Sequence, residues 1–444
     1  MPRGASTDTG LFADGFRDLT LPRGIFYWLG RAKKEAELNA TIGSAMARAR
    51  DFLDTDSTDV ITCFLPAVHE IVKNLPSESI YPYAPIAGLP EFRRKWKKWV
   101  LQKAAARRPL HDELVSTPVV VPGVTVGLHF LCRLFLSPGE TVLCSDLRWE
   151  NYDLILEGIL GLKVVSFNLF DGDRMDVAAF STALKDAARR DGRVVVILNF
   201  PNNPSGYMPD GAESEKIRAA ALETADAGAK VILIFDDAYD GYVYDPAVPR
   251  YSPFADFVNL HPNVFPFKLD GLSKEFLFYG GRVACVTAGL HDTGNPGERE
   301  RTLEDKLAAF IRGTLSNSPH LVQSAAARAL DVNDKVSEER EKIRRIIGDR
   351  WYSLSRLMRE SSPRLAPAPF NSGFFCHVNV SGVRAFELAD HMLKTHRVGV
   401  VASEIPQLGI NAVRIAYCSV LAEDLPRLVE SLKDSTDSLA SGTF

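Results

Sequence analysis

The stretch RVVVILNFPNNPSG, residues 193–206, joins an apolar run of strand length to a polar loop that follows it directly. A second stretch, KVILIFDDAY at residues 230–239, has the same form and ends in two carboxylates and a tyrosine. Residues 210–228, between them, have the pattern of a helix. Runs that are apolar on both faces and separated by helices are typical of a parallel sheet covered on both sides. The two stretches therefore predict an α/β fold.

Four further apolar runs of strand length flank these two. They are PVVVPG (118–123), ETVLCSD (140–146), KVVSFNL (163–169) and NVFPFKLDG (263–271). Helical periodicity occupies residues 124–136 and 175–190. We expect one large domain over residues 65–335, with a mostly parallel sheet sandwiched by helices.

The remainder of the chain predicts a smaller α+β domain at residues 336–444, on which the N-terminal segment, residues 1–64, packs. A charged stretch at residues 331–356 predicts a long exposed helix that leaves the large domain. It is followed by SGFFCHVNV (372–380), a helix at 384–396, VGVVAS (398–403), NAVRIAYC (411–418) and a last helix at 422–433. The polar residues from 434 onward are expected to be frayed.

The composition excludes several classes of function. The net charge of −4 offers no basic surface for nucleic acid or for an anionic membrane. No uncharged apolar run is long enough to span a bilayer, and MPRGASTDTG lacks the apolar core of a signal peptide. The six cysteines are scattered, as is typical of buried thiols in a reducing cytosol, and the histidines have no metal-ligand spacing. We expect a cytoplasmic protein without a metal site.

Ligands of an open parallel sheet collect at the carboxyl ends of the strands, so the residues that follow each strand are the candidates for a site. These are PNNPSG (201–206), Asp236, Asp237, Tyr239, Ser273, Lys274, Val124, Thr125 and Trp149. Pyridoxal phosphate requires such a set: a lysine for a Schiff base, a carboxylate at the ring nitrogen, donors at the phenolic oxygen and a flat group against the ring. Its phosphate is suited by an arginine and by the N-terminus of a helix.

The motifs resemble those of the class I aminotransferases, pyridoxal-phosphate enzymes of fold type I, with aspartate aminotransferase as the nearest relative. The resembling segments are NNPSG, FDDAY, SKEFLFYGGR, RWENY, NAVRIAY, YAPIAGLPEF, LNATIG and IRGTLSNSP, and the resemblance covers about residues 20–435. It implies a seven-stranded sheet in the large domain and a homodimer with shared active sites. It also implies transamination between an L-amino acid, acidic or aromatic, and a keto acid.

The resemblance also implies a role for each matched residue. Lys274 would form the Schiff base, Asp236 would face the ring nitrogen, and Asn203 and Tyr239 would bond the phenolic oxygen. Trp149 would stack on the ring, while Arg282, Val124, Thr125, Ser273 and the partner subunit's Tyr83 would surround the phosphate. The substrate would contact Arg414 through its α-carboxylate, with Asn151 and Gly43 beside it and Arg312 reaching across the dimer toward its side chain. Asp237 is expected to be structural.

One departure from the family pattern is Gly271, which stands where a serine or threonine usually contacts the phosphate. The missing contact is expected from Ser273 or Thr125. Because every matched residue serves formation of a carbanion and not its fate, elimination, replacement (including γ-chemistry on S-adenosylmethionine) and decarboxylation stay open as alternatives. A non-enzymatic regulator is disfavoured, because no DNA-binding module or basic surface accompanies the matched region. Three residues also have purely structural interpretations: Trp149 in the core, Tyr83 in packing and Arg312 in a salt bridge.

Overall fold

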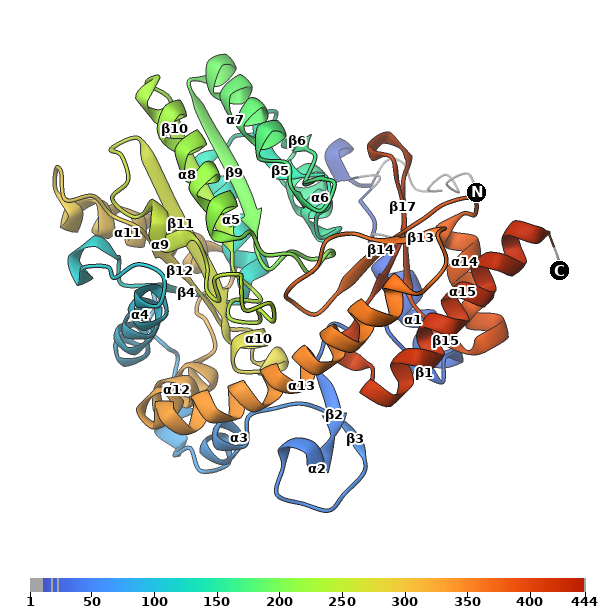
Figure 1. The fold of residues 1–444 in the computed structure, drawn as a ribbon. Helices are drawn as coiled ribbons and strands as arrows, with labels where there is room; N and C mark the ends of the chain where they lie inside the picture. Colours follow the sequence, from blue (N-terminus) through green and yellow to red (C-terminus); the bar gives the residue numbers. More distant parts are fainter. Residues whose placement is uncertain (1–10, 17–18, 22–23, 443–444) are drawn as a thin grey trace.

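A computed structural model describes residues 11–16, 19–21 and 24–442 of the chain. Its largest sheet has seven strands in the order β4-β12-β11-β10-β9-β5-β6 (Figure 1). In that order they are β4 (Val119–Val121), β12 (Ala284–Ala288), β11 (Val264–Gly271), β10 (Lys230–Asp236), β9 (Arg193–Asn199), β5 (Thr141–Ser145) and β6 (Lys163–Phe167). Strand β12 is antiparallel to both its neighbours, whereas the strands from β11 to β6 pair in parallel. The predicted seven-stranded, mostly parallel sheet is confirmed.

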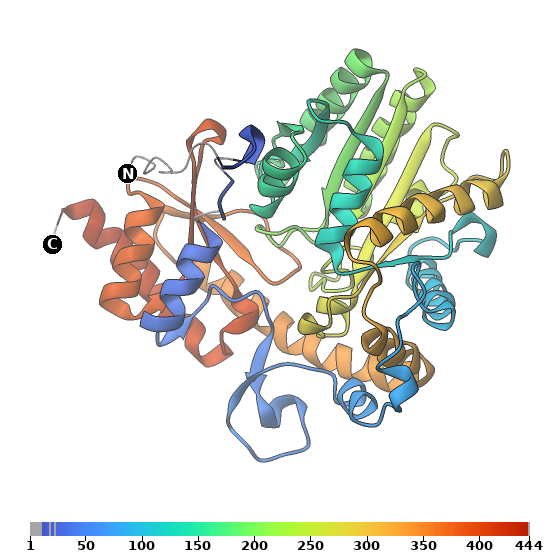
Figure 2. The same ribbon diagram turned by 180° about the vertical axis from the view of Figure 1, so that it is seen from behind.

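Both faces of this sheet are buried, as the sequence predicts. Along β9, Val194 and Val196 belong to one apolar core, whereas Val195 and Ile197 belong to another. Helices α7 (Val177–Asp191) and α8 (Gly211–Asp226) cover the first face, in front in Figure 1. Helices α5 (Val124–Phe135) and α11 (Pro296–Thr314) cover the second, in front in Figure 2. Period-two alternation thus places successive side chains of one strand in two separate cores.

Further helices and two hairpins complete this part of the chain. The helices are α2 (Ala49–Phe52), α3 (Pro66–Lys73), α4 (Pro90–Ala105), α6 (Asn151–Asp153), α9 (Phe254–Phe257), α10 (Leu272–Glu275) and α12 (His320–Ala329). The hairpins are β2 (Met46–Arg48) with β3 (Val60–Thr62), and β7 (Phe170–Asp171) with β8 (Arg174–Met175). Helix α10 directly follows β11, so that residues 272–275 lie at the carboxyl end of the parallel sheet.

A second, antiparallel sheet lies beside the first (Figure 1). Its order is β13 (Leu365–Pro367), β14 (Cys376–Val380), β17 (Ile410–Ile415) and β16 (Val401–Ile405). Helix α14 (Ala385–His391) packs on this sheet, and α15 (Leu425–Ser441) packs on α14. The N-terminal segment joins this unit: β1 (Leu38–Asn39) pairs with β15 (Val398–Gly399), and α1 (Ile25–Glu35) contacts β15 and β16. The described part of residues 1–64 therefore contacts the small unit, while residues 1–10, 17–18 and 22–23 lie outside the described residues; the domain limits stay a prediction.

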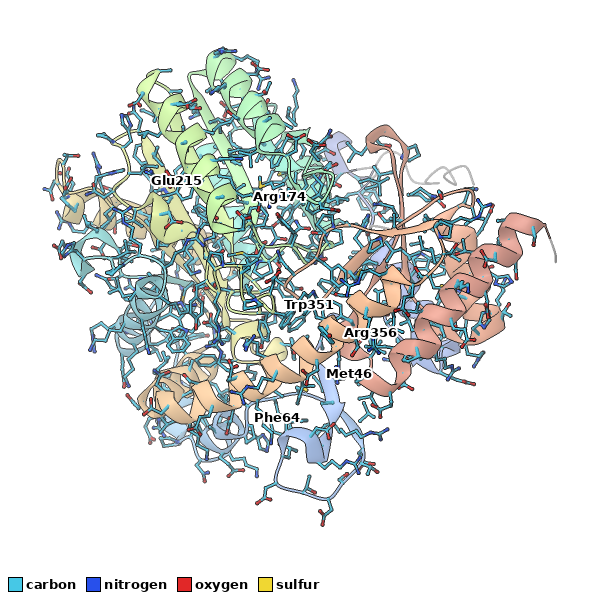
Figure 3. All side chains as sticks on the ribbon, in the orientation of Figure 1. Met46, Phe64, Arg174, Glu215, Trp351 and Arg356 are labelled. Carbon is cyan, nitrogen blue, oxygen red and sulfur yellow. The ribbon has the colours of Figure 1, made fainter. Side chains whose placement is uncertain are left out.

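Helix α13 (Asn333–Arg359) extends along both units (Figure 1). Near its start Arg340 lies 3.4 Å from the Glu275 carboxylate of α10, and further along Arg350 donates to the Cys418 carbonyl at 2.6 Å. Between the two sheets Trp351, labelled in Figure 3, donates from Nε1 to the Phe370 carbonyl at 3.0 Å. The helix therefore links α10, at the carboxyl end of the large sheet, to the segment that follows β17 of the small sheet.

Two sequence predictions about helices are wrong in detail. The helix predicted over 331–356 as exposed is amphipathic, and buries Val336, Ile343, Ile347, Leu354 and Met358. Its apolar residues recur at helical spacing, so that one face packs while the charges stay outside.

The last helix does not end at residue 433, and residues 434–441 are not frayed. Helix α15 continues to Ser441, with Ser435 and Thr436 buried and Leu439 packed against the core. Small hydroxyl side chains can be buried when they bond within the helix, as Thr436 Oγ1 does to the Leu432 carbonyl at 2.7 Å.

Three further features bear on function. All six cysteines are buried and free, as expected. Among the described helices, none combines the length and hydropathy needed to cross a bilayer. Within the described residues, no group of three or more histidine, cysteine or acidic side chains is arranged to hold a metal ion.

Candidate active site

The carboxyl ends of the parallel strands open on a cavity of about 430 Å³ that lies between the two sheets. The cavity is completed by β17 of the small sheet and by residues 41–44 of the N-terminal segment. The predicted site residues that line it are Gly43, Val124, Thr125, Trp149, Asn203, Asp236, Tyr239, Ser273, Lys274, Arg282 and Arg414. Segments more than 370 residues apart in the sequence thus meet in one cavity.

Three predicted site residues lie outside this cavity in the single chain. Tyr83 is 87% exposed, and Asn151 begins α6 behind Trp149. Arg312 is exposed at the end of α11, where its Nη1 donates to Ser316 Oγ at 2.6 Å. The Tyr83 loop and the segment after Arg312 are neighbours, because Asn317 Nδ2 donates to the Ala84 carbonyl at 2.6 Å. Tyr83 and Arg312 therefore belong to one surface region of the molecule.

Lys274 projects from α10 into the cavity and is half-buried. The Tyr242 hydroxyl fixes its backbone by donating to its carbonyl at 3.0 Å. Its Nζ lies 4.9 Å from the Tyr279 ring centroid and 5.7 Å from that of Tyr239. Burial, together with the nearby cations Arg282 and Arg414, lowers the pKa of Lys274 to about 8. A much larger fraction of this amine is neutral near pH 7 than of an ordinary lysine.

Asp236, at the end of β10, is the buried carboxylate of the site. Its Oδ2 accepts a short hydrogen bond from the Tyr152 hydroxyl, and its Oδ1 accepts from the Ala238 amide at 3.2 Å. Burial raises the pKa of Asp236, while these two hydrogen bonds and the charge of Lys274 act against that rise. The carboxylate is thus held in one orientation by donors that favour its anion.

Two residues of this arrangement were missed by sequence reasoning: Tyr152 and Asn199. Asn199 Nδ2 donates to the Asp236 carbonyl at 2.9 Å, and its Oδ1 accepts from the Asn203 amide at 2.8 Å. The available signals were the asparagine that ends RVVVILN and the tyrosine of RWENY. Neither signal identifies a partner, because Asp236 lies 37 residues from Asn199 and 84 residues from Tyr152 in the sequence.

Arg414, on β17, closes the opposite side of the cavity. Its Nη1 donates to Asn203 Oδ1 and its Nη2 donates to the Thr41 carbonyl, each at 3.2 Å. The guanidinium lies 4.3 Å from the centroid of the Phe375 ring, and its buried Nε has no hydrogen-bond partner among the described residues. A buried guanidinium with an unused donor is suited to receive a carboxylate.

A third part of the cavity is suited to a phosphate. Gly123 precedes α5 with φ of +91°, and a Cβ there would lie 2.3 Å from Nη2 of Arg282. The glycine thus leaves room for the guanidinium beside the N-terminus of a twelve-residue helix at Val124 and Thr125. Arg282 Nη1 also donates to Ser273 Oγ at 3.0 Å. Helix amides, a hydroxyl and an arginine fork are together suited to bind an anion.

Gly271 departs from the family pattern for a steric reason. It pairs with Ala284 in the β11–β12 ladder, where a Cβ would lie 2.7 Å from Ala284 Cβ and 2.8 Å from the Val283 carbonyl oxygen. The serine or threonine usual at this position has no room here. Ser273 and Thr125 line the cavity nearby, as the sequence predicts for the replacement contact.

We expect Gly271→Ala to destabilise the protein by about 1–3 kcal/mol, because backbone atoms of β12 must move. A lower midpoint of thermal unfolding would report this loss. Gly280→Ala is the matched control, since nothing lies within 4 Å of its Cβ position. Equal midpoints for the two variants would contradict the steric explanation.

A cluster of buried charges holds the end of α10 through Glu275. This buried charge cluster consists of Lys103, Lys268, Asp237, Asp240, Asp270 and Glu275. Lys103 Nζ lies 2.7 Å from Glu275, 3.1 Å from Asp240 and 3.2 Å from Asp270. Trp99 Nε1 donates to Glu275 at 2.6 Å. The residue that follows Lys274 is therefore anchored in the interior, and Asp237, paired with Lys268, has the structural part expected of it.

Comparison with known proteins agrees with this architecture. The family model described as aminotransferase class I and II matches residues 51–432. An aspartate aminotransferase of Sulfurisphaera tokodaii is 21% identical over 84% of this chain and 86% of its own length. Aromatic-amino-acid aminotransferase 2 of Thermococcus litoralis is 24% identical over 83% and 88%. The crystal structure of an aminotransferase from Anaerococcus prevotii superimposes with a TM-score of 0.82 at 22% identity, covering 96% of this chain and 99% of that one.

The fold and the family match define a pyridoxal-phosphate enzyme of fold type I. The chain belongs to the class I and II aminotransferase family, and is a transaminase that uses amino acids and keto acids. The residues of the cavity fit its cofactor. They offer an amine of lowered pKa, a buried carboxylate and an anion site in one space.

Proposed function

We propose that this transaminase binds pyridoxal phosphate covalently through a Schiff base to Lys274. The observation that carries the proposal is the Lys274 amine, whose pKa is lowered to about 8 and which faces the same cavity as Asp236 and Arg414. A neutral amine is the nucleophile that an aldehyde requires. Neighbouring cations and partial burial supply it here without a separate base.

The other cavity residues would hold the cofactor along its length. We propose that Asp236 faces the ring nitrogen, that Asn203 and Tyr239 bond the phenolic oxygen, and that Trp149 lies against the ring. Arg282, Ser273, Val124 and Thr125 would hold the phosphate. Tyr152 and Asn199 are positioning residues for this set, through their hydrogen bonds to Asp236 and Asn203.

Pyridoxal phosphate, when bound, supplies an aldehyde and a ring that withdraws electrons from the substrate's α-carbon. The chain's residues control the proton movements around it. The Asp236 carboxylate keeps a proton on the ring nitrogen. Once the substrate amine has replaced it, the freed Lys274 amine would take the proton from the α-carbon and return one on the cofactor side, as a general base and acid whose pKa is near the operating pH. Arg414 binds the substrate α-carboxylate in a fork, with Asn151 and Gly43 beside it, and so sets the direction of the breaking C–H bond.

The apolar wall of the cavity supports a substrate with an apolar or aromatic side chain. Ile25, Leu29 and Ile42 line the cavity, and its cations, Lys274, Arg282 and Arg414, already have the roles proposed above. No unassigned cation of the described chain faces the cavity for a second carboxylate. Relatives named as aromatic-amino-acid aminotransferases and as aspartate aminotransferases both occur. The preference proposed for this chain therefore rests on the residues of the wall.

A homodimer in the cytoplasm is part of the same proposal. Tyr83 and Arg312 project from one surface region, and Tyr83 is 87% exposed, as expected for a residue that contacts another subunit. In a dimer the partner's Tyr83 would reach the phosphate of this chain's cofactor. A monomeric, fully active enzyme in sedimentation analysis would contradict this assembly.

The test is to mix the holoenzyme with single amino acids, without a keto acid, and to follow conversion of the cofactor to its amine form by absorbance. We expect phenylalanine or leucine to convert it with a higher kcat/KM than aspartate. Release of pyruvate, 2-oxobutyrate or carbon dioxide without conversion would instead indicate elimination, replacement or decarboxylation.

Arg312→Ala tests the choice between apolar and acidic substrates. We expect kcat/KM for phenylalanine to change by less than about threefold, as for the control Arg301→Ala, an exposed residue of the same helix. If the enzyme prefers aspartate and Arg312→Ala lowers kcat/KM for aspartate at least about 30-fold, the partner's Arg312 binds an acidic side chain and the apolar preference is wrong.

A further inference from the structure

The contact between Glu150 and helix α1 joins the two units of the molecule at the mouth of the cavity. Glu150 follows Trp149 in the loop after β5 of the large sheet. Its Oε2 accepts a hydrogen bond of 3.0 Å from the Ile25 amide, in the first turn of α1. Helix α1 itself packs on β15 and β16, on the side of the small sheet. One carboxylate therefore ties the N-terminal helix across to the rim of the large sheet.

The packing at this contact is close. A Cβ on Gly24 would lie 2.2 Å from Glu150 Oε1 and 2.4 Å from Oε2, so that a larger residue would displace the carboxylate from this position. The carboxylate is at the N-terminus of an eleven-residue helix, where unpaired amides and the helix dipole favour a negative charge. The side chains of Arg31 with Asp390, 2.5 Å apart, hold the helix to the small unit on its other side.

The helix that Glu150 holds contributes to the active-site cavity. Ile25 and Leu29, one helical turn apart, line it together with Ile42. On the other side of the contact is a second cavity of about 410 Å³, which Gly24 and Glu150 line. The first turn of α1 and the Glu150 side chain thus form the partition between the two cavities. Without the hydrogen bond, nothing polar in the described contacts fastens Ile25 to the large sheet.

We propose that Glu150 is a specificity-determining positioning residue, whose carboxylate anchors α1 so that Ile25 and Leu29 form the wall that receives the substrate's side chain. The inference rests on the proposed function, since it concerns the side-chain pocket of that site. Burial raises the pKa of Glu150, while the Ile25 amide and the charge of Arg414 counter the rise. These two groups offset part of the effect of burial, and the pKa of Glu150 stays above its usual value.

The experiment uses Glu150→Ala and Glu150→Gln in the holoenzyme. Loss of a hydrogen bond to a charged group corresponds to roughly tenfold or more in an equilibrium constant. In Glu150→Ala we expect the KM for phenylalanine or leucine to rise about tenfold, and the KM for alanine, whose methyl group does not reach the wall, to change less than about twofold. Glu150→Gln keeps an acceptor for the Ile25 amide and is expected to recover most of the loss.

Hydrogen exchange of the same proteins, measured without substrate, tests the anchor independently of activity. Amides of residues 25–29 should exchange at least about tenfold faster in Glu150→Ala than in the unmodified protein. The matched control is Asp153→Ala, a carboxylate of the same segment that pairs with Arg148 at 2.8 Å; it should leave both the KM values and the exchange unchanged.

Unchanged exchange in Glu150→Ala would overturn the proposal. An equal rise of the KM for alanine and for phenylalanine would also overturn it, because Glu150 would then affect binding of the α-carboxylate at Arg414. If the unmodified enzyme transaminates no amino acid, the proposed function fails, and faster exchange in Glu150→Ala would still support the anchor while removing its link to substrate choice.

Discussion

Lys274→Ala is expected to abolish transamination, with kcat lower by about 10⁴-fold or more. The substitution removes the amine proposed both to bond the cofactor and to move the substrate's proton, and among the described residues no other lysine lines the cavity. Pyridoxal phosphate could still bind through the anion site and Asp236, but without a covalent link. The measurement is the visible absorbance of the purified protein before and after borohydride reduction, with activity assayed in parallel.

The control for this prediction is Lys433→Ala, which removes an exposed lysine from α15. It should retain full activity and the reduced, covalently labelled cofactor. If Lys274→Ala also retains a borohydride-stable label, a different lysine carries the cofactor and the site is wrongly assigned. Added methylamine should restore part of the activity of Lys274→Ala, because the cavity would then have space for a small amine.

Lys103→Met is expected to lower the free energy of unfolding by about 3–5 kcal/mol. Lys103 is 3% exposed and pairs with Asp240, Asp270 and Glu275, so its loss removes a cation shared by three buried carboxylates and leaves the cluster with an excess of negative charge. Methionine keeps the length of the side chain, so the effect reports charge more than volume. The shift of the guanidinium unfolding midpoint, followed by tryptophan fluorescence, measures the loss.

An exposed ion pair provides the comparison. Lys185 Nζ lies 2.7 Å from Glu223, a shorter distance than two of the three contacts of Lys103, but both partners are open to solvent. Lys185→Met should therefore cost less than about 1 kcal/mol. Similar midpoints for the two variants would show that the buried charge cluster does not depend on Lys103.

The sequence predicted the large sheet closely because its strands carry their own signal. The runs at 193–200 and 230–236 are apolar on both faces, and β9 and β10 begin and end within one residue of them. No strand was predicted at ACVTA, which forms β12, because five mostly small residues directly after a turn also fit an irregular loop. The end of α15 was misjudged for the opposite reason: its polar composition hides Leu439 and the buried Ser435.

The candidate site could be predicted as far as its residues follow strands. Asp236, Asn203 and Lys274 each end a strand or follow one, so a single topological rule brings them together. Contacts that depend on packing between distant segments could not be predicted. Glu150 and Ile25 are 125 residues apart, and nothing in WEN or GIF indicates that they meet. Roles for Tyr83 and Arg312 require a second subunit, which no pattern within one chain can position.

Helix α13 has a consequence for the dimensions of the reaction site. Arg340 binds the residue after Lys274, and Arg350 binds the carbonyl of Cys418, four residues beyond Arg414. An α-helix rises 1.5 Å per residue, so the two arginines, ten positions apart, are separated by about 15 Å along the helix axis. The helix therefore helps to set the distance between the proposed amine and the proposed carboxylate fork. A deletion of one residue between them would shorten it by about 1.5 Å and turn one anchor by about 100° relative to the other. The length of a helix that lies outside the cavity thereby affects the spacing of the two groups proposed to act on the substrate.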